Sequence, residues 1–227
     1  MVNYLKLVRV EQYLKNIFIF LPLFFALKIT DLNLVLNTFI AFISFCFLAS
    51  SIYIFNDYCD IEEDKNHPIK KDRPLASGKI SKTNALILMS VFLIIGLSIS
   101  YVLNIRIFYL NIFYLVLNLF YSIRLKHKPI IDVFIISIGF VLRLFVGSVS
   151  GNIPLSMWII IITFLLAIFL ALAKRRDDVI IYLSSGIKSR PVIDGYNLEF
   201  LNASMIVMVS VVIVSYIMII KRRRDGP

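Results

Sequence analysis

Cysteine, glycine and charged residues are scarce in this sequence, and each scarcity removes a class of protein. Two cysteines among 227 residues cannot staple a disulfide-rich fold, and 8 glycines exclude a collagen-like repeat. Charged residues make up 17% of the chain and hydrophobic residues 59%, so neither a disordered chain nor an ordinary soluble domain fits. No P-loop, dinucleotide-binding, zinc-protease or C-x-x-C motif occurs, which leaves those chemistries without support.

Long apolar runs are present instead, and they are typical of membrane-spanning helices. The candidate runs are 10–28, 34–55, 84–104, 107–123, 130–150, 155–173 and 201–220. The first is the least apolar because Glu11 and Lys15 lie within it, and since no small-residue cleavage site follows it, we expect a retained span. The runs are too long and continuous for barrel strands. We therefore predict an all-α, polytopic transmembrane helix bundle of about seven spans.

The distribution of lysine and arginine predicts the orientation of the chain. These residues gather in the N-terminal segment and in the loops 56–83, 124–128 and 174–200. The positive-inside rule places these segments in the cytoplasm, so we expect a multi-pass protein of the cell inner membrane. The net charge of +10 then reflects membrane topology, and no nucleic-acid partner is expected.

The last residues do not follow this pattern. After about seven spans, the cations of Lys221–Arg224 would lie outside, against the positive-inside rule. We therefore expect residues 1–220 to form the transmembrane domain and residues 221–227 to be an atypical basic tail.

Three aspartates follow the second predicted span at a spacing that points to metal binding. If the helix continues here, Asp57, Asp60 and Asp64 stand at i, i+3 and i+7 and share one face. Like charges repel, so a divalent cation among them is the natural explanation, and oxygen-only ligands favour Mg²⁺ shared with substrate phosphates. Helix-end acids that bind nothing are the alternative.

The segment directly after these acids is basic. It contains His67, Lys70, Lys71 and Arg73. Cations beside a predicted metal site suit phosphate groups that the metal also touches. Attraction of these side chains to anionic lipid headgroups is the alternative.

A second polar group, Lys174 to Asp178, closes the sixth predicted span. On a continuing helix Lys174 faces Asp177 and Asp178, which alone would be an ordinary exposed ion pair. The predicted topology puts this group on the same membrane face as Asp57, so the two could line one cytoplasmic cavity. The same face also receives Lys15, Asn16, Lys126 and Asp132.

Arg143 lies inside the fifth predicted span, where an ionisable side chain is costly. It is expected either to line a cavity or to be satisfied by snorkelling or an internal ion pair.

Taken in order, these motifs resemble the UbiA superfamily of intramembrane prenyltransferases, and most closely its decaprenyl-phosphate phosphoribosyltransferase branch. The superfamily's first acid motif has the form Asn56-Asp57-x-x-Asp60-x-x-x-Asp64. The closer match is carried by Gln12-x-x-Lys15-Asn16, Asp64-Lys65-x-His67-Pro68-x-Lys70-x-x-Arg73-Pro74, Tyr121-Ser122-x-x-Leu125-Lys126, Asp132-Val133, Gly139-Phe140-Val141-Leu142-Arg143 and Lys174-Arg175-Arg176. The likeness covers about residues 5–218.

The resemblance implies a Mg²⁺-dependent reaction in which a polyprenyl phosphate attacks C1 of 5-phosphoribosyl diphosphate and releases pyrophosphate. It assigns Asp57, Asp60 and Asp64 to the metal and diphosphate, with Asp57, Asp60 and Lys174 as the catalytic set. It assigns Asn56, His67, Lys70 and Arg73 to the sugar-phosphate donor, and Lys15, Asn16, Lys126, Arg143, Lys174 and Arg175 to contacts with the substrates.

Two features depart from the family pattern. The superfamily's usual second motif is a spaced acid pair, and the branch has Lys-Arg followed shortly by Glu, whereas here Asp177 and Asp178 follow Lys174-Arg175. Family members also usually have nine spans, and this chain has about seven. We expect a C-terminal truncation, with low stability and weak turnover. The alternatives are a UbiA-type enzyme that joins a polyprenyl diphosphate to an aromatic acceptor, and an inactive membrane protein that binds polyprenyl phosphate.

Overall fold

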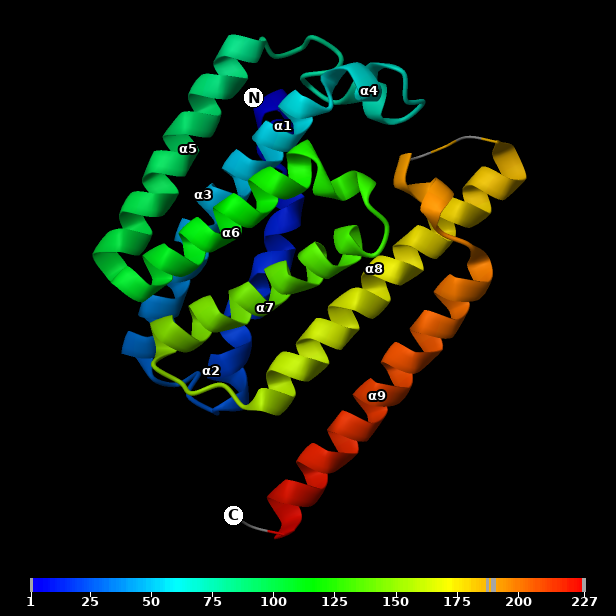
Figure 1. The fold of residues 1–227 in the computed structure, drawn as a ribbon. Coiled ribbons are helices and arrows are strands. Elements are labelled where there is room, and N and C mark those ends of the chain that lie inside the picture. The colour runs from blue at the N-terminus through cyan, green and yellow to red at the C-terminus, as the bar shows by residue number, and fades with distance from the viewer. Residues whose placement is uncertain (1, 187, 189–190, 226–227) are drawn as a thin grey trace. The chain divides into compact units, whose positions relative to one another are not determined.

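The structure, a computed structural model, describes residues 2–186, 188 and 191–225. Over this range the chain forms helices and no strand, which confirms the predicted all-α class. Six of the described helices are long and apolar enough to cross a membrane (Figure 1). They are α3 (Leu32–Cys59), α5 (Lys82–Leu103), α6 (Ile105–Ile123), α7 (Ile131–Gly151), α8 (Met157–Ser185) and α9 (Leu198–Asp225), and they correspond to the last six predicted runs.

The first predicted span, 10–28, is not one continuous α-helix. The chain forms α1 (Val2–Val8), the 3-10 helix η1 (Val10–Phe20) and α2 (Leu21–Phe25). Arg9, between α1 and η1, has a φ of 53°, in the left-handed region that interrupts an α-helix. Pro22 in α2 lacks a backbone N–H, which prevents a regular i to i−4 ladder.

This broken segment nevertheless follows α3 along its length in the opposite direction. Three contacts record its course: the hydroxyls of Tyr13 and Ser50 are 2.9 Å apart, Asn16 Nδ2 lies 3.2 Å from Cys46 Sγ, and the rings of Phe20 and Phe42 are 5.6 Å apart. The segment therefore runs beside most of α3. Because it consists of short helical pieces, it is not recognised as one long apolar helix.

The chain divides into two compact units. The first contains residues 1–123 and 142–154, and the second contains residues 124–141 and 155–227. The continuous helix α7 therefore contributes its first half to the second unit and its second half to the first.

In the first unit, a buried apolar cluster fixes the segment that follows α3. Its members are Leu7, Val8, Ile54, Ile61, Leu75, Ile80 and Ala85. They come from α1, the end of α3, α4 (Ile61–Lys65), the connection that contains η2 (Lys70–Asp72), and α5. Burial of these side chains holds the predicted acid and basic motifs against the end of α3.

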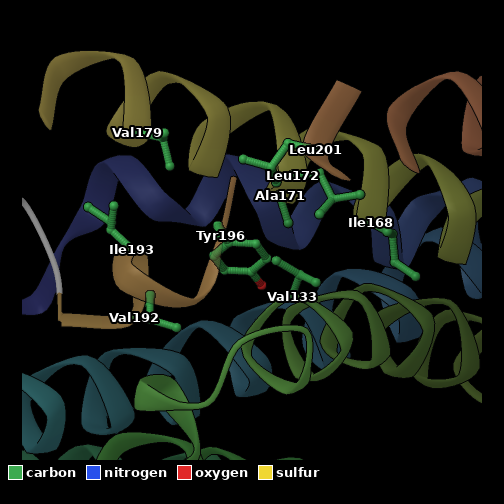
Figure 2. Close-up of a cluster of buried hydrophobic side chains, with 9 residues drawn as sticks. All are labelled: Val133, Ile168, Ala171, Leu172, Val179, Val192, Ile193, Tyr196 and Leu201. Atoms are coloured by element: carbon green, nitrogen blue, oxygen red, sulfur yellow. The ribbon is translucent and has the colours of Figure 1, made fainter. Parts of the chain in front are cut away.

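In the second unit, the connection between α8 and α9 is docked by its own apolar side chains (Figure 2). Val192, Ile193 and Tyr196, from and just after η4 (Pro191–Gly195), join a cluster built from α7, α8 and α9. The other members are Val133, Ile168, Ala171, Leu172, Val179 and Leu201. Val192, Ile193 and Tyr196 are therefore packed parts of the unit.

Local sequence signals set several helix ends. Asp31 caps α3 by accepting hydrogen bonds from the backbone N–H groups of Asn33 and Leu34, and Ser81 and Ser156 cap α5 and α8 in the same way. Gly186, with a φ of 70°, ends α8 in the left-handed conformation. As expected, α8 continues through the polar residues 174–178.

The backbone of α9 runs through the predicted boundary between residues 220 and 221. The side chains from residue 219 onward, including the predicted basic tail, lie outside the described residues, and this boundary stays a prediction.

Candidate functional site

The strongest polar constellation in the first unit is a group of two aspartates and two arginines at the end of α3. Asp57, whose side chain is 2% exposed, accepts hydrogen bonds from Arg9 Nη2 and, at 3.2 Å, from Arg73 Nη1. The same Arg73 nitrogen lies 2.7 Å from Asp64 Oδ2, and Asp64 is also buried. Buried carboxylates are stable as anions only when they are paired, and these two share Arg73.

Asp60 is positioned differently from the other two acids. The helix α3 ends at Cys59, Asp60 has φ −95° and ψ 5°, and α4 begins at Ile61. Asp60 Oδ2 lies 3.1 Å from Asn56 Nδ2. The condition that one regular helix continues through Asp64 is therefore not met, because the backbone changes conformation at Asp60.

The donor chemistry of this group suits a hard divalent cation. Within the described part of the chain, no three His, Cys, Asp or Glu side chains gather closely enough to hold a metal ion, so the predicted three-aspartate set is not assembled. Asp57 and Asp64 remain as a pair of carboxylates joined through Arg73. Mg²⁺ is commonly bound by one or two carboxylates together with substrate phosphates, and this pair fits that mode.

The predicted donor-binding residues around the acids have separate local roles. His67 Nδ1 accepts hydrogen bonds from the backbone N–H groups of Ile69 and Lys70, both at 3.2 Å, which shapes the turn that begins η2. The accepting Nδ1 places the proton of the neutral ring on Nε2. Lys70 is half-buried at the start of η2, and Arg73 follows this helix in an extended conformation before Pro74.

A second constellation in the first unit joins Asn16 and Arg143, which are 127 residues apart in sequence. Arg143 Nε donates to Asn16 Oδ1 at 2.9 Å, and Nη2 donates to the hydroxyl of Tyr114 at 3.1 Å. The guanidinium carbon also lies 4.9 Å from the ring centroid of Phe45. Both predicted residues are buried, so Arg143 holds η1 against α7 and α6 in this conformation.

A glycine makes this close approach possible. A Cβ atom added to Gly147, one turn after Arg143 in α7, would lie 1.9 Å from the backbone oxygen of Ile19 in η1. No side chain fits there, and the backbones of η1 and α7 can meet only at glycine.

In the second unit, Arg175 belongs to a buried network. Its Nε donates to Asp132 Oδ2 at 2.6 Å, and its Nη1 lies 3.3 Å from Asp178. The hydroxyl of Tyr196 donates to the other oxygen of Asp132 at 2.6 Å, and it accepts a hydrogen bond from the backbone N–H of Ile130 at 2.7 Å. Burial, and then the hydrogen bond to Asp132, raise the pKa of Tyr196.

This network adds a partner that the sequence does not indicate for the second polar group. Asp178 pairs with Arg175. Arg175 is 2% exposed and points to α7, while Lys174 is exposed on α8. Lys126 is half-buried on η3 (Leu125–His127) in the same unit, and Lys15 is exposed on η1 in the first unit.

Two residues of these networks are missed by the sequence reasoning. In the sequence, Arg9 counts only as one of the positive charges of the N-terminal segment, and Tyr196 belongs to no recognised motif. Arg9 stands 48 residues from Asp57, and Tyr196 stands 64 residues from Asp132, so no local spacing connects either pair. The left-handed backbone at Arg9 and at Ile130 is a structural signal that marks both places.

Apolar spanning helices that end in buried arginine–aspartate clusters define a membrane-embedded helical protein with sites suited to anionic groups. The family model of the UbiA prenyltransferase family matches residues 17–221. The chain belongs to this family of prenyl-type transferase enzymes, which confirms the resemblance seen in the motifs.

Two curated relatives carry the same name, decaprenyl-phosphate phosphoribosyltransferase. The protein of Mycolicibacterium smegmatis is 30% identical over 93% of this chain and 68% of its own length. The protein of Corynebacterium glutamicum is 32% identical over 93% of this chain and 65% of its own length. The chain thus spans about two thirds of the length of these relatives.

A solved structure supports the fold independently. The UbiA homolog of Archaeoglobus fulgidus, solved with DMAPP and Mg²⁺, superimposes with a TM-score of 0.79 at 22% identity, over 95% of this chain and 77% of that one. At this identity the likeness establishes the helical fold of the family.

Proposed function

We propose that this protein transfers the phosphoribosyl group of 5-phosphoribosyl diphosphate to a polyprenyl phosphate. The observation that carries the proposal is the buried pair Asp57 and Asp64, bridged by Arg73 and joined by Arg9 at the end of a membrane helix. The names of the two relatives supply the reaction class.

The chemistry is a substitution at C1 of the ribose. An oxygen of the lipid phosphate forms a bond to C1 as the bond between C1 and the diphosphate oxygen breaks, and both bonding electrons leave with pyrophosphate. The nucleophile is already an anion, so no general base is needed. The principal demand on the protein is to stabilise negative charge on the departing group.

Asp57 and Asp64 are the residues that would hold Mg²⁺. Divalent charge at this pair, when bound, supplies electrostatic stabilisation of the diphosphate. Arg73 and Arg9 already contact the carboxylates, so a small change of partner brings their guanidinium groups to phosphate oxygens. Lys70 adds positive charge from η2, and Asp60 and Asn56 complete the polar end of α3.

The remaining predicted residues divide into contacts and supports. We assign Lys174, Lys15 and Lys126 to phosphate contacts, because the first two are exposed and the third is half-buried. Arg175, Arg143 and Asn16 are buried and bonded within the protein, so we assign them to positioning, as we do His67, which shapes the η2 turn. We also propose that the acid-bearing end of α3 faces the cytoplasm across the inner membrane, following the positive-inside rule.

The test is transfer of labelled phosphoribose into an organic-extractable lipid by the purified protein in lipid nanodiscs. Asp57→Asn is expected to lower turnover at least a hundredfold. The neutral amide lacks the negative charge that pairs with two arginines and would bind the metal. The matched control is Glu62→Gln, which removes an acid on α4 that pairs with exposed Lys65 and is expected to leave turnover unchanged. Removal of Mg²⁺ with EDTA is expected to stop transfer, and added Mg²⁺ to restore it.

The alternative reactions give different outcomes in the same preparation. Transfer of a polyprenyl group from its diphosphate to an aromatic acid, without phosphoribosyl transfer, would refute the proposed donor. Binding of polyprenyl phosphate without any transfer would identify a lipid-binding protein instead.

A further inference from the structure

A groove with one polar end lies between α8 and α9 in the second unit. The two helices lie side by side (Figure 1), and the groove between them has a volume of about 620 Å³. Its walls include Phe169 from α8 and Met205, Ile206 and Val209 from α9. From Asn202 to Ser210 it extends about 12 Å along α9, at a helical rise of about 1.5 Å per residue.

The walls of the groove belong to helices that qualify as membrane spans. An 18-residue window of α8 has a mean hydropathy of 2.5 and one within Leu198–Met218 of α9 has a mean hydropathy of 2.2, and most residues of both windows are not buried within the protein. Ile206 is 67% exposed and Val209 is 37% exposed. A hydrocarbon chain is therefore the natural occupant of the apolar part.

The polar end of the groove contains Arg176, whose guanidinium group has N–H donors available for a ligand. Arg176 Nε donates to Asn202 Oδ1 at 2.7 Å, and within the described residues its two terminal nitrogens make no hydrogen bond and no ion pair. A guanidinium at the edge of a membrane span is stabilised by an anion, and phosphate matches its two parallel N–H donors. Arg176 points to α9, whereas Arg175 of the buried network points to α7, so this groove is separate from that network.

We propose that this groove binds an anionic glycerophospholipid of the surrounding bilayer. The phosphate lies on Arg176 and Asn202, and one acyl chain lies along Phe169, Ile206 and Val209. Bilayer lipid suits the groove because its walls belong to two apolar spans and its polar end carries the guanidinium of Arg176. Bound in this way, the lipid ties α8 to α9 near the connection that holds Tyr196.

The experiment uses the full chain in nanodiscs of phosphatidylcholine with and without phosphatidylglycerol. Phosphatidylglycerol is expected to raise the unfolding temperature of the native protein, because a ligand that binds the folded state stabilises it. Native mass spectrometry after mild detergent release is expected to show retained phosphatidylglycerol. Arg176→Ala is expected to remove the temperature increment and to weaken retention about tenfold or more, the loss of a charge-assisted hydrogen bond of about 1.5–3 kcal/mol.

Two further variants separate the groove from general surface charge. Val209→Trp fills the apolar part, leaves Arg176 in place and is expected to weaken retention similarly. Arg124→Ala removes an exposed arginine just after α6 and is expected to change nothing. All variants are first shown to unfold cooperatively in pure phosphatidylcholine.

The proposal is overturned if Arg176→Ala and Val209→Trp retain phosphatidylglycerol as the native chain does. It is also overturned if polyprenyl phosphate at equal concentration displaces the phospholipid, or if the variant Ile206→Cys crosslinks two copies of the chain through the groove.

Discussion

Removal of one hydroxyl group, in Tyr196→Phe, should loosen the connection between α8 and α9. The ring stays in the apolar cluster, so the packing is kept (Figure 2). What is lost is the hydrogen bond to Asp132 and the acceptor for the backbone N–H of Ile130. Ile130 has a φ of 69°, which is strained for a β-branched residue, so this acceptor holds an unfavourable turn.

The size of the effect follows from the charge of the acceptor. A buried hydrogen bond to a charged group contributes about 1.5–3 kcal/mol, so the free energy of local opening should fall by about 2 kcal/mol. At about 1.4 kcal/mol per factor of ten, the open population rises roughly thirtyfold. Asp132→Asn should have a larger effect, about 3–5 kcal/mol, because it leaves Arg175 buried with less countercharge.

Hydrogen exchange measured by mass spectrometry tests this reasoning. Amides of residues 192–201 should exchange roughly thirtyfold faster in Tyr196→Phe, while amides of α5 in the first unit keep their rates. Tyr216→Phe, which removes the hydroxyl of an exposed tyrosine on α9, is the matched control. Equal exchange in Tyr196→Phe and the native protein would show that the hydroxyl does not hold the connection.

Two further predictions follow from the same structure. Gly147→Ala should lower the free energy of unfolding by about 1–3 kcal/mol, because the added Cβ would overlap the backbone of Ile19. Thermal unfolding should show this loss. The control Gly151→Ala, whose Cβ would meet only side chains, should change the unfolding temperature little. An alkaline pH series should show the raised pKa of Tyr196: its stabilisation is complete below the unfolded pKa of about 10 and is lost as the pH rises toward the folded value. The native protein should therefore lose stability above about pH 10 more steeply than Tyr196→Phe, and parallel curves would contradict the assignment.

The sequence motifs predict an acid site at the end of α3 but do not predict how its side chains pair. The spacing of Asp57 and Asp64 predicts side chains on a common face, and the structure joins them through Arg73. The contribution of Arg9 depends on α1 packing against the end of α3, a contact between segments about 48 residues apart. Asp60 differs because the backbone departs from the helix there, which a spacing rule cannot show.

The second polar group shows what spacing along one helix leaves out. Because side chains at i+3 and i+4 are neighbours, spacing on α8 predicts that Lys174 faces Asp177 and Asp178. The structure also pairs Asp178 with Arg175, which is buried against Asp132 of α7. The burial of Arg175 depends on how the helices pack, and spacing along one helix cannot show it.

By itself the sequence determined the helical membrane class, the positions of six spans and the segments that carry chemistry. These follow from composition and from the length of apolar runs, which depend only on neighbouring residues. Only the tertiary structure decided that the first span is broken and antiparallel to α3, that Arg9 joins Asp57, and that Arg143 meets Asn16. Such contacts depend on close approach between distant segments, as at Gly147 and Ile19, and the energies that select them arise only when the helices are packed.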